Sequence, residues 1–193
     1  MNKVLVMTGF LSFLSGMFGS SASAQDYKVA EVYAGLRKMI FEAKPANIGV
    51  EEPVWGVLME TGYPQAVATL VALADGTVSL YFSYGGGIIG LGPHAGPKRV
   101  SKELLTLAPR YLKHCQATKV FPLPNRAHTR FYFLTNDGIV TTEAKEEDLE
   151  YQRHALSPPF HKAQELITEV RLVDEKLHAE QGASPDAAKA PRR

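Results

Sequence analysis

Hydrophobic and polar residues follow strand-like patterns in three consecutive segments, residues 54–60, 66–74 and 77–84. The middle segment is almost wholly apolar, which indicates a strand interior to a sheet, whereas the third alternates, with Val78 and Leu80 facing one way and Tyr81 the other. Asp75-Gly76 separates the second and third segments and predicts a tight hairpin in which both turn residues have positive φ. The connections are too short for crossovers, so the pattern predicts antiparallel strands.

A second hairpin and three helices complete the pattern. Residues 130–135 and 138–144 flank Asn136-Asp137-Gly138, a strong turn signal. Apolar residues at spacings of three and four predict helices over residues 26–43, 98–116 and 158–177, and Pro109 should kink or divide the second of them. The predicted fold class is therefore α+β, a five-stranded mostly antiparallel sheet flanked by three helices.

The first 24 residues have the pattern of a secretory signal peptide. Lys3 precedes an apolar stretch, and Ala22-Ser23-Ala24 offers small residues for cleavage near Ala24. We expect residues 25–181 to form a single globular domain and residues 182–193, rich in Ala, Pro, Lys and Arg, to be a disordered tail. The mature chain would be exported, periplasmic or secreted, without a transmembrane segment. The alternative is a native N-terminal helix, and then a cytoplasmic protein.

Charge and cysteine content narrow the function classes. Removing Lys3 leaves 20 basic residues of the original 21, against 20 acidic ones, a balance that argues against a nucleic-acid partner. The single cysteine, Cys115, forbids an intramolecular disulfide, and we expect it to be a buried, inert thiol. No spacing of Cys and His is typical of a metal site, and we expect no metal and no cofactor.

A glycine-rich stretch over residues 84–92 formally matches the dinucleotide-binding pattern. It lacks the parallel β-α-β context that the pattern requires, because its strand belongs to a hairpin and Pro93 and Pro97 delay the next helix. Free backbone N–H groups, a helix N-terminus and cationic side chains instead suggest a shallow anion site, the alternative being a plain glycine turn. The candidate anion-binding residues are Gly85, Gly86, Gly87, Gly90, Lys98, Arg99 and Lys102.

An enzyme would need catalytic side chains that lie close together in one cleft. His154, Ser157 and His161 cluster near the start of the last helix, and they would have to converge with Asp137 or Glu143 in one cleft to form a hydrolase-like site. The chain has neither a G-x-S-x-G nor an H-E-x-x-H motif. We therefore assign no catalytic residue and keep the hydrolase as an alternative.

The predicted order of elements is helix, three strands, helix, two strands, helix over residues 26–178. This order resembles the roadblock, longin and profilin-like group of α+β domains. The resemblance implies a five-stranded antiparallel sheet sandwiched by helices, which binds a protein partner or dimerises through a sheet edge or a helix face. It transfers no catalytic residue. The sequence as a whole suggests a small exported, non-catalytic binding protein, with a protein partner or a second copy, and with an anionic ligand as an alternative.

Overall fold

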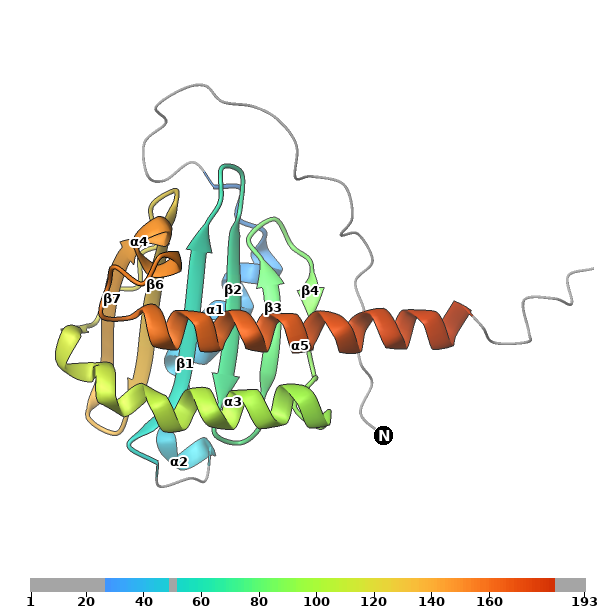
Figure 1. Cartoon of the computed structure of the whole chain (residues 1–193), viewed down its shortest axis with the longest axis horizontal. Helices are drawn as coiled ribbons and strands as arrows, with labels where there is room; N and C mark the ends of the chain where they lie inside the picture. Colours follow the sequence, from blue (N-terminus) through green and yellow to red (C-terminus); the bar gives the residue numbers. More distant parts are fainter. Residues whose placement is uncertain (1–26, 49–51, 183–193) are drawn as a thin grey trace, which may run out of the picture.

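The computed structural model describes residues 27–48 and 52–182, which form an open antiparallel sheet with helices on both faces (Figure 1). The signal peptide predicted over residues 1–24 lies outside the described residues, and so does the tail predicted over residues 182–193 except for Gly182, which ends α5. The helices are α1 (Glu31–Glu42), α2 (Pro45–Ile48), α3 (Ala95–Leu107), the 3-10 helix η1 (Ala108–His114), α4 (Glu146–Glu150) and α5 (Ser157–Gly182). The strands are β1 (Val54–Gly62), β2 (Val67–Leu73), β3 (Val78–Phe82), β4 (Gly87–Ile88), β5 (Gln116–Thr118), β6 (His128–Thr135) and β7 (Gly138–Lys145).

The α+β class is confirmed, but the described part of the sheet has seven strands where the sequence predicts five. The strand order is β4-β3-β2-β1-β6-β7-β5, and every pair is antiparallel. The five predicted strands are all present, and β2 is interior, as its apolar composition indicates. The two additional strands, β4 and β5, are short and lie at the two edges, so they carry no alternating pattern long enough to be recognised.

The two predicted hairpins form, with one correction to the first turn. Gly76 has φ of 90°, whereas Asp75 is not in the left-handed region, so the prediction that both residues have positive φ is wrong. The N–H of Leu73 donates to the carbonyl of Thr77, which makes this a three-residue turn. Such a turn needs only its last residue left-handed, and the Asp75 carboxylate accepts a hydrogen bond from the N–H of Thr77.

The helices divide between the two faces of the sheet (Figure 1). In the figure α3 and α5 cross one face, and α1 lies behind the sheet on the other. The alternation predicted for β3 is confirmed, because Val78 and Leu80 are in the core under α3 and α5 whereas Tyr81 belongs to the cluster under α1. No described helix is both long enough and apolar enough to cross a bilayer.

The helix boundaries differ from the sequence prediction in several places. α3 begins at Ala95, three residues before the predicted start, and Pro97 lies in its first turn, where a missing N–H costs nothing, instead of delaying the helix. α1 begins at Glu31, five residues later than expected, and α5 continues to Gly182. The predicted 98–116 helix is divided, as Pro109 indicates: α3 ends at Leu107, and Pro109 lies in the first turn of η1. A short helix that the three predicted ones do not include, α4, follows β7.

Gly35 weakens α1, and its replacement by alanine should stabilise the protein by about 1 kcal/mol. It lies exposed within the helix, and a Cβ added there meets no atom within 4 Å. Urea unfolding of Gly35→Ala measures the gain. As a contrast, Gly92→Ala should destabilise, because its Cβ would collide with the main-chain carbonyl oxygen of Gly76. A loss of stability in Gly35→Ala would contradict the exposed position of this residue.

Candidate functional site

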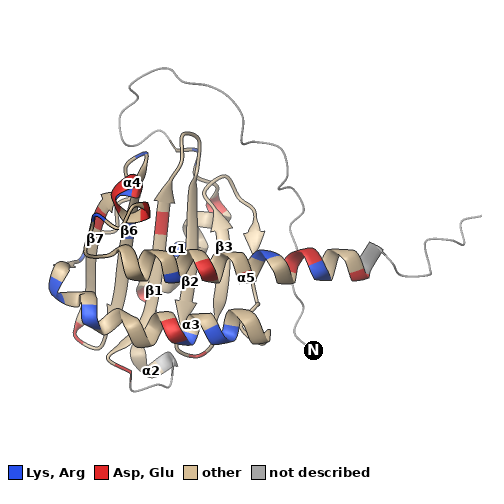
Figure 2. Ribbon diagram, in the orientation of Figure 1, with Lys and Arg blue, Asp and Glu red and all other residues tan. Residues whose placement is uncertain are grey.

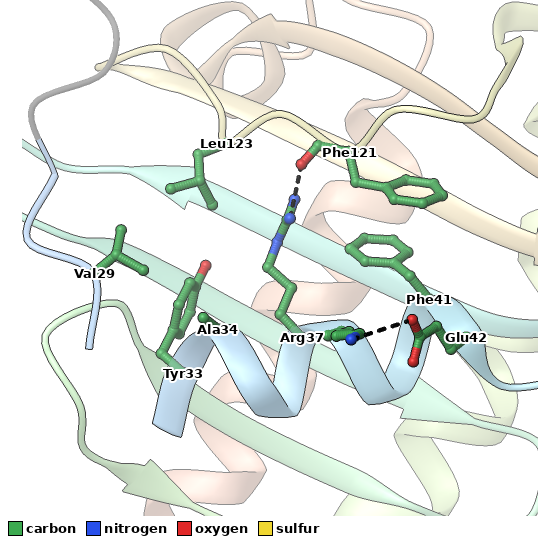
Figure 3. Close-up of a pocket in the computed structure, with 9 residues that line it drawn as sticks. Val29, Tyr33, Ala34, Arg37, Phe41, Glu42, Phe121 and Leu123 are labelled. Atoms are coloured by element: carbon green, nitrogen blue, oxygen red, sulfur yellow. Dashed lines mark hydrogen bonds and ion pairs between the residues drawn. The ribbon is translucent and has the colours of Figure 1, made fainter. Parts of the chain in front are cut away.

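A groove runs between α1 and the extended segment 121–123 that precedes β6 (Figure 3). It has a volume of about 380 Å³, within the usual range for ligand sites. Its walls are mainly apolar, and α1 supplies most of them because successive turns of the helix present one flank to the segment. The lining residues are Val29, Tyr33, Ala34, Arg37, Lys38, Phe41, Glu42, Phe121 and Leu123.

Arg37 spans the floor of the groove and ties α1 to the sheet (Figure 3). Its Nε donates to Glu60 Oε1 over 2.7 Å and its Nη2 to Glu60 Oε2 over 2.9 Å, a bidentate pair. Its Nη1 donates to the carbonyl oxygen of Phe121 over 2.7 Å. The Glu60 side chain is completely buried on the central strand β1. The guanidinium therefore joins α1, β1 and the far wall of the groove.

Other polar groups around Glu60 also bind one another. The Thr69 hydroxyl donates to Glu60 over 3.3 Å and shares a 2.9 Å hydrogen bond with the hydroxyl of Tyr33. The Tyr132 hydroxyl donates to the carbonyl oxygen of Pro122 over 2.6 Å. Burial, and then the negative charge of Glu60, raise the pKa of Tyr132 to about 12 and that of Tyr33 still further. Both phenols are neutral at physiological pH and serve as hydrogen-bonding groups of the core.

Stacked aromatic rings close one end of the groove. Phe41 of α1 lies parallel to Phe121, with ring centroids 4.1 Å apart and an interplanar angle of 3°. The Arg37 guanidinium carbon lies 4.7 Å from the centroid of Phe41. These contacts hold the 121–123 segment at a fixed separation from the helix, so the groove is formed before any ligand enters.

The rim of the groove has no net charge. Lys38 and Glu42 pair over 3.7 Å and expose 71% and 66% of their side chains. Outside the rim, α1 carries the exposed apolar side chains Val32 and Met39, which are 49% and 67% accessible. At about 100° per residue these two side chains lie on the flank of α1 away from Ala34 and Phe41, so they form a separate apolar surface.

The glycines proposed for anion binding are divided between a turn, a strand and a loop. Gly85 and Gly86 form the turn after β3, where the N–H of Gly85 donates to the carbonyl of Phe82. Gly87 belongs to β4, and Gly90 lies in the loop that leads to α3.

The proposed cations lie together on α3, at the opposite end of β3 from the Gly85–Gly86 turn (Figure 1). The chain before α3 returns to the start of β3, since the N–H of Leu91 donates to the carbonyl of Val78. Arg99 is engaged with carboxylates of α3 and α5, whereas Lys98 and Lys102 are exposed. The structure thus brings the three cations together but not with the glycine turn.

The groups proposed for a hydrolase are held in other contacts. Ser157 is 2% exposed, and its hydroxyl donates to the main-chain carbonyl of Asp148 over 3.4 Å. The Nδ1 atom of His154 accepts from the N–H of Leu156 over 3.2 Å. His161 is exposed on α5.

The carboxylates suggested for this site lie elsewhere. Glu143 of β7 pairs with Arg130 and accepts a hydrogen bond from the main-chain N–H of Asn125, on the α1 side of the sheet. Asp137 is in the exposed β6–β7 turn. Among the described residues, no hydrogen bond or ion pair joins either carboxylate to His154, Ser157 or His161.

A second hollow, of about 320 Å³, lies beside α4 and is lined by charged residues that include Lys145, Glu146 and Glu150. Burial, and then the charge of Glu150, raise the pKa of Glu146. Within the described ranges, no three His, Cys, Asp or Glu side chains are grouped so as to hold a metal ion.

Cys115 follows η1 and is half-buried rather than fully buried. Its Sγ lies 3.5 Å from the carbonyl oxygen of Tyr111, and burial raises its pKa to about 11. A thiol with so high a pKa is almost wholly protonated at neutral pH, and so it is a poor nucleophile.

Comparison with protein-family models, curated proteins and solved structures finds no match to this chain. The site is therefore defined by its geometry. Sequence reasoning missed Arg37, Glu60 and Phe121. One signal was available: Glu60 is the only charge in the otherwise apolar or neutral strand 54–62, and a charge buried in a central strand requires a partner.

Proposed function

We propose that this chain is a non-catalytic binding protein whose groove beside α1 takes an apolar side chain from an extended segment of a partner protein. The observation that carries the proposal is the preformed groove itself: its walls are apolar, its rim is neutral and its floor groups already bind one another. The polar groups of the floor are already paired, so they provide few hydrogen bonds for a charged ligand. An apolar side chain can bind there without leaving a polar group unpaired.

A polypeptide fits this groove better than a small molecule. Sites for small molecules usually bury most of the ligand. Here the rim residues Lys38 and Glu42 are largely exposed, so a ligand in the groove stays partly open to solvent. An extended segment can insert one side chain into the groove while its backbone stays above the rim. Export with cleavage near Ala24 is part of the same proposal, and it rests on the sequence of residues 1–24.

Two adjacent residues of α1 give a matched test. Ala34 lines the groove, whereas Gly35 is exposed and an added Cβ there meets nothing within 4 Å. A random peptide library is selected on the immobilised full chain, and the enriched peptides are then titrated against Ala34→Arg and Gly35→Arg. We expect enriched peptides with aliphatic or aromatic side chains, a loss of affinity of about tenfold or more for Ala34→Arg, and little change for Gly35→Arg.

Circular dichroism melts show whether both variants stay folded, which their exposed positions favour. Peptides that bind Ala34→Arg as tightly as the unmodified chain would place binding elsewhere and overturn the proposal. A selection that enriches only charged peptides would do the same.

A further inference from the structure

Helix α5 extends beyond the edge of the sheet. It has 26 residues and crosses the strands from the β6 side to β4, and Figure 1 shows it continuing past β4. Val170 is the last fully buried residue whose burial is described, and residues 171–180 are exposed or half-buried. Residues 171–182, here called the overhang, are about 18 Å long at 1.5 Å per residue.

The underside of the overhang continues the apolar stripe of the buried part of α5. Leu166, Val170, Val173 and Leu177 follow one another at spacings of four, three and four. The last two are only half-buried, although they pack against the same core cluster. Ile88 of β4 is half-buried in the same way. The core is thus incompletely covered at this edge.

The same edge of the sheet is open. β4 ends the strand order and pairs on one side only, with β3 through Leu80 and Tyr81. No described strand pairs with its outer side. An unpaired edge offers backbone N–H and C=O groups to a further strand.

We propose that a second copy of this chain binds at this edge, with β4 pairing antiparallel to β4 of the partner and each overhang lying on the partner's half of the joined sheet. A two-fold axis at the β4 edge places both α5 helices on the same face of that sheet, running antiparallel. Each copy then supplies both halves of the contact, an edge strand and an apolar overhang, as a self-complementary two-fold interface requires.

The charges of the overhang suit a copy of itself. Both signs are present along it, as the blue and red bands of Figure 2 show. Arg171 and Lys176 are interspersed with Asp174, Glu175 and Glu180, so that each overhang presents no block of like charge to the partner copy. Any other partner would have to supply both an edge strand and a covering surface, and this chain has the two side by side.

This interface is separate from the groove, which lies beside α1 on the opposite face of the sheet. Success or failure of one proposal therefore leaves the other untouched.

The test is the mass of the protein by size-exclusion chromatography with light scattering, for the unmodified chain and two variants. We expect twice the chain mass at high micromolar concentration, falling on dilution. Leu177→Glu should weaken the dimer on the order of 100-fold, because each dimer loses two buried leucines. Leu172→Glu is the matched control: Leu172 is 55% exposed and lies about 140° around the helix from Leu177, so its dimer should be unchanged.

Hydrogen exchange of the unmodified chain gives a second measurement that needs no variant. Protection of the amides in Gly87–Ile88 and the overhang should rise with protein concentration, while that of α1 should not. A monomer at every concentration, equal effects of the two variants, or exchange independent of concentration would each overturn the proposal.

Discussion

Replacing Arg37 with alanine should lower the free energy of unfolding by about 3–5 kcal/mol, the usual cost of removing one partner of a buried ion pair. The cost is high because the Glu60 side chain is completely buried and loses its charged partner, with only the Thr69 hydroxyl left as a side-chain donor. The change also removes the hydrogen bond to the carbonyl of Phe121, so the 121–123 wall of the groove is loosened. Chemical unfolding followed by circular dichroism measures the loss.

Two further variants show whether the ion pair is the cause. Glu60→Leu should cost less than Arg37→Ala, because the Arg37 side chain is 13% exposed and can turn towards the water of the groove. The double change of Arg37 and Glu60 to leucine should cost less than Arg37→Ala, since no buried charge is left unpaired. Lys38→Ala, at an exposed position of the same helix, should be nearly neutral. If Arg37→Ala and Lys38→Ala had similar stability, the buried pair would not anchor α1.

Replacing Trp55 with alanine should destabilise the fold by about 3–5 kcal/mol, the range for removing a large aromatic side chain from a core. Trp55 is 2% exposed in β1 and packs in the cluster under α1, together with Leu58 and Tyr132. Trp55→Phe should cost much less, because a ring remains in most of the space. Thermal melts by circular dichroism compare the two. A melting temperature of Trp55→Ala equal to that of the unmodified chain would show that the ring contributes nothing to packing.

The strands could be predicted from sequence because each has a local pattern of apolar residues, either alternating or continuous. β3 alternates between two cores, β2 is buried along its whole length, and Gly76 and Gly138 adopt the positive φ that their turns require. These features depend on residues that are close together in the sequence, so the sequence pattern alone predicts them. The interruption of the second helix at Pro109 is local in the same sense.

The groove could not be predicted, because its parts are far apart in the sequence. Arg37 and Phe121 are separated by 84 residues, and neither type of residue is unusual where it stands. The linker that contributes Phe121 and Leu123 has the sequence of an irregular connection. It lies against α1 only because the folded sheet places the two segments side by side. The glycine-rich stretch shows the converse case, because β4 divides residues that are adjacent in sequence and leaves Gly85 and Gly90 on either side of an edge strand. The anion site stays a prediction.

The anchors of α1 also impose an order on folding. Arg37 bonds to Glu60, 23 residues later, and to Phe121, 84 residues later, and Tyr33 bonds to Thr69, 36 residues later. Contacts of such separation form only after the intervening chain has been brought together. A helix of 12 residues is marginal on its own in water, and α1 contains Gly35 and has no side-chain cap at its N-terminus. We therefore expect α1, the first described helix to be synthesised, to be among the last elements to pack, with its apolar residues exposed to other chains until then.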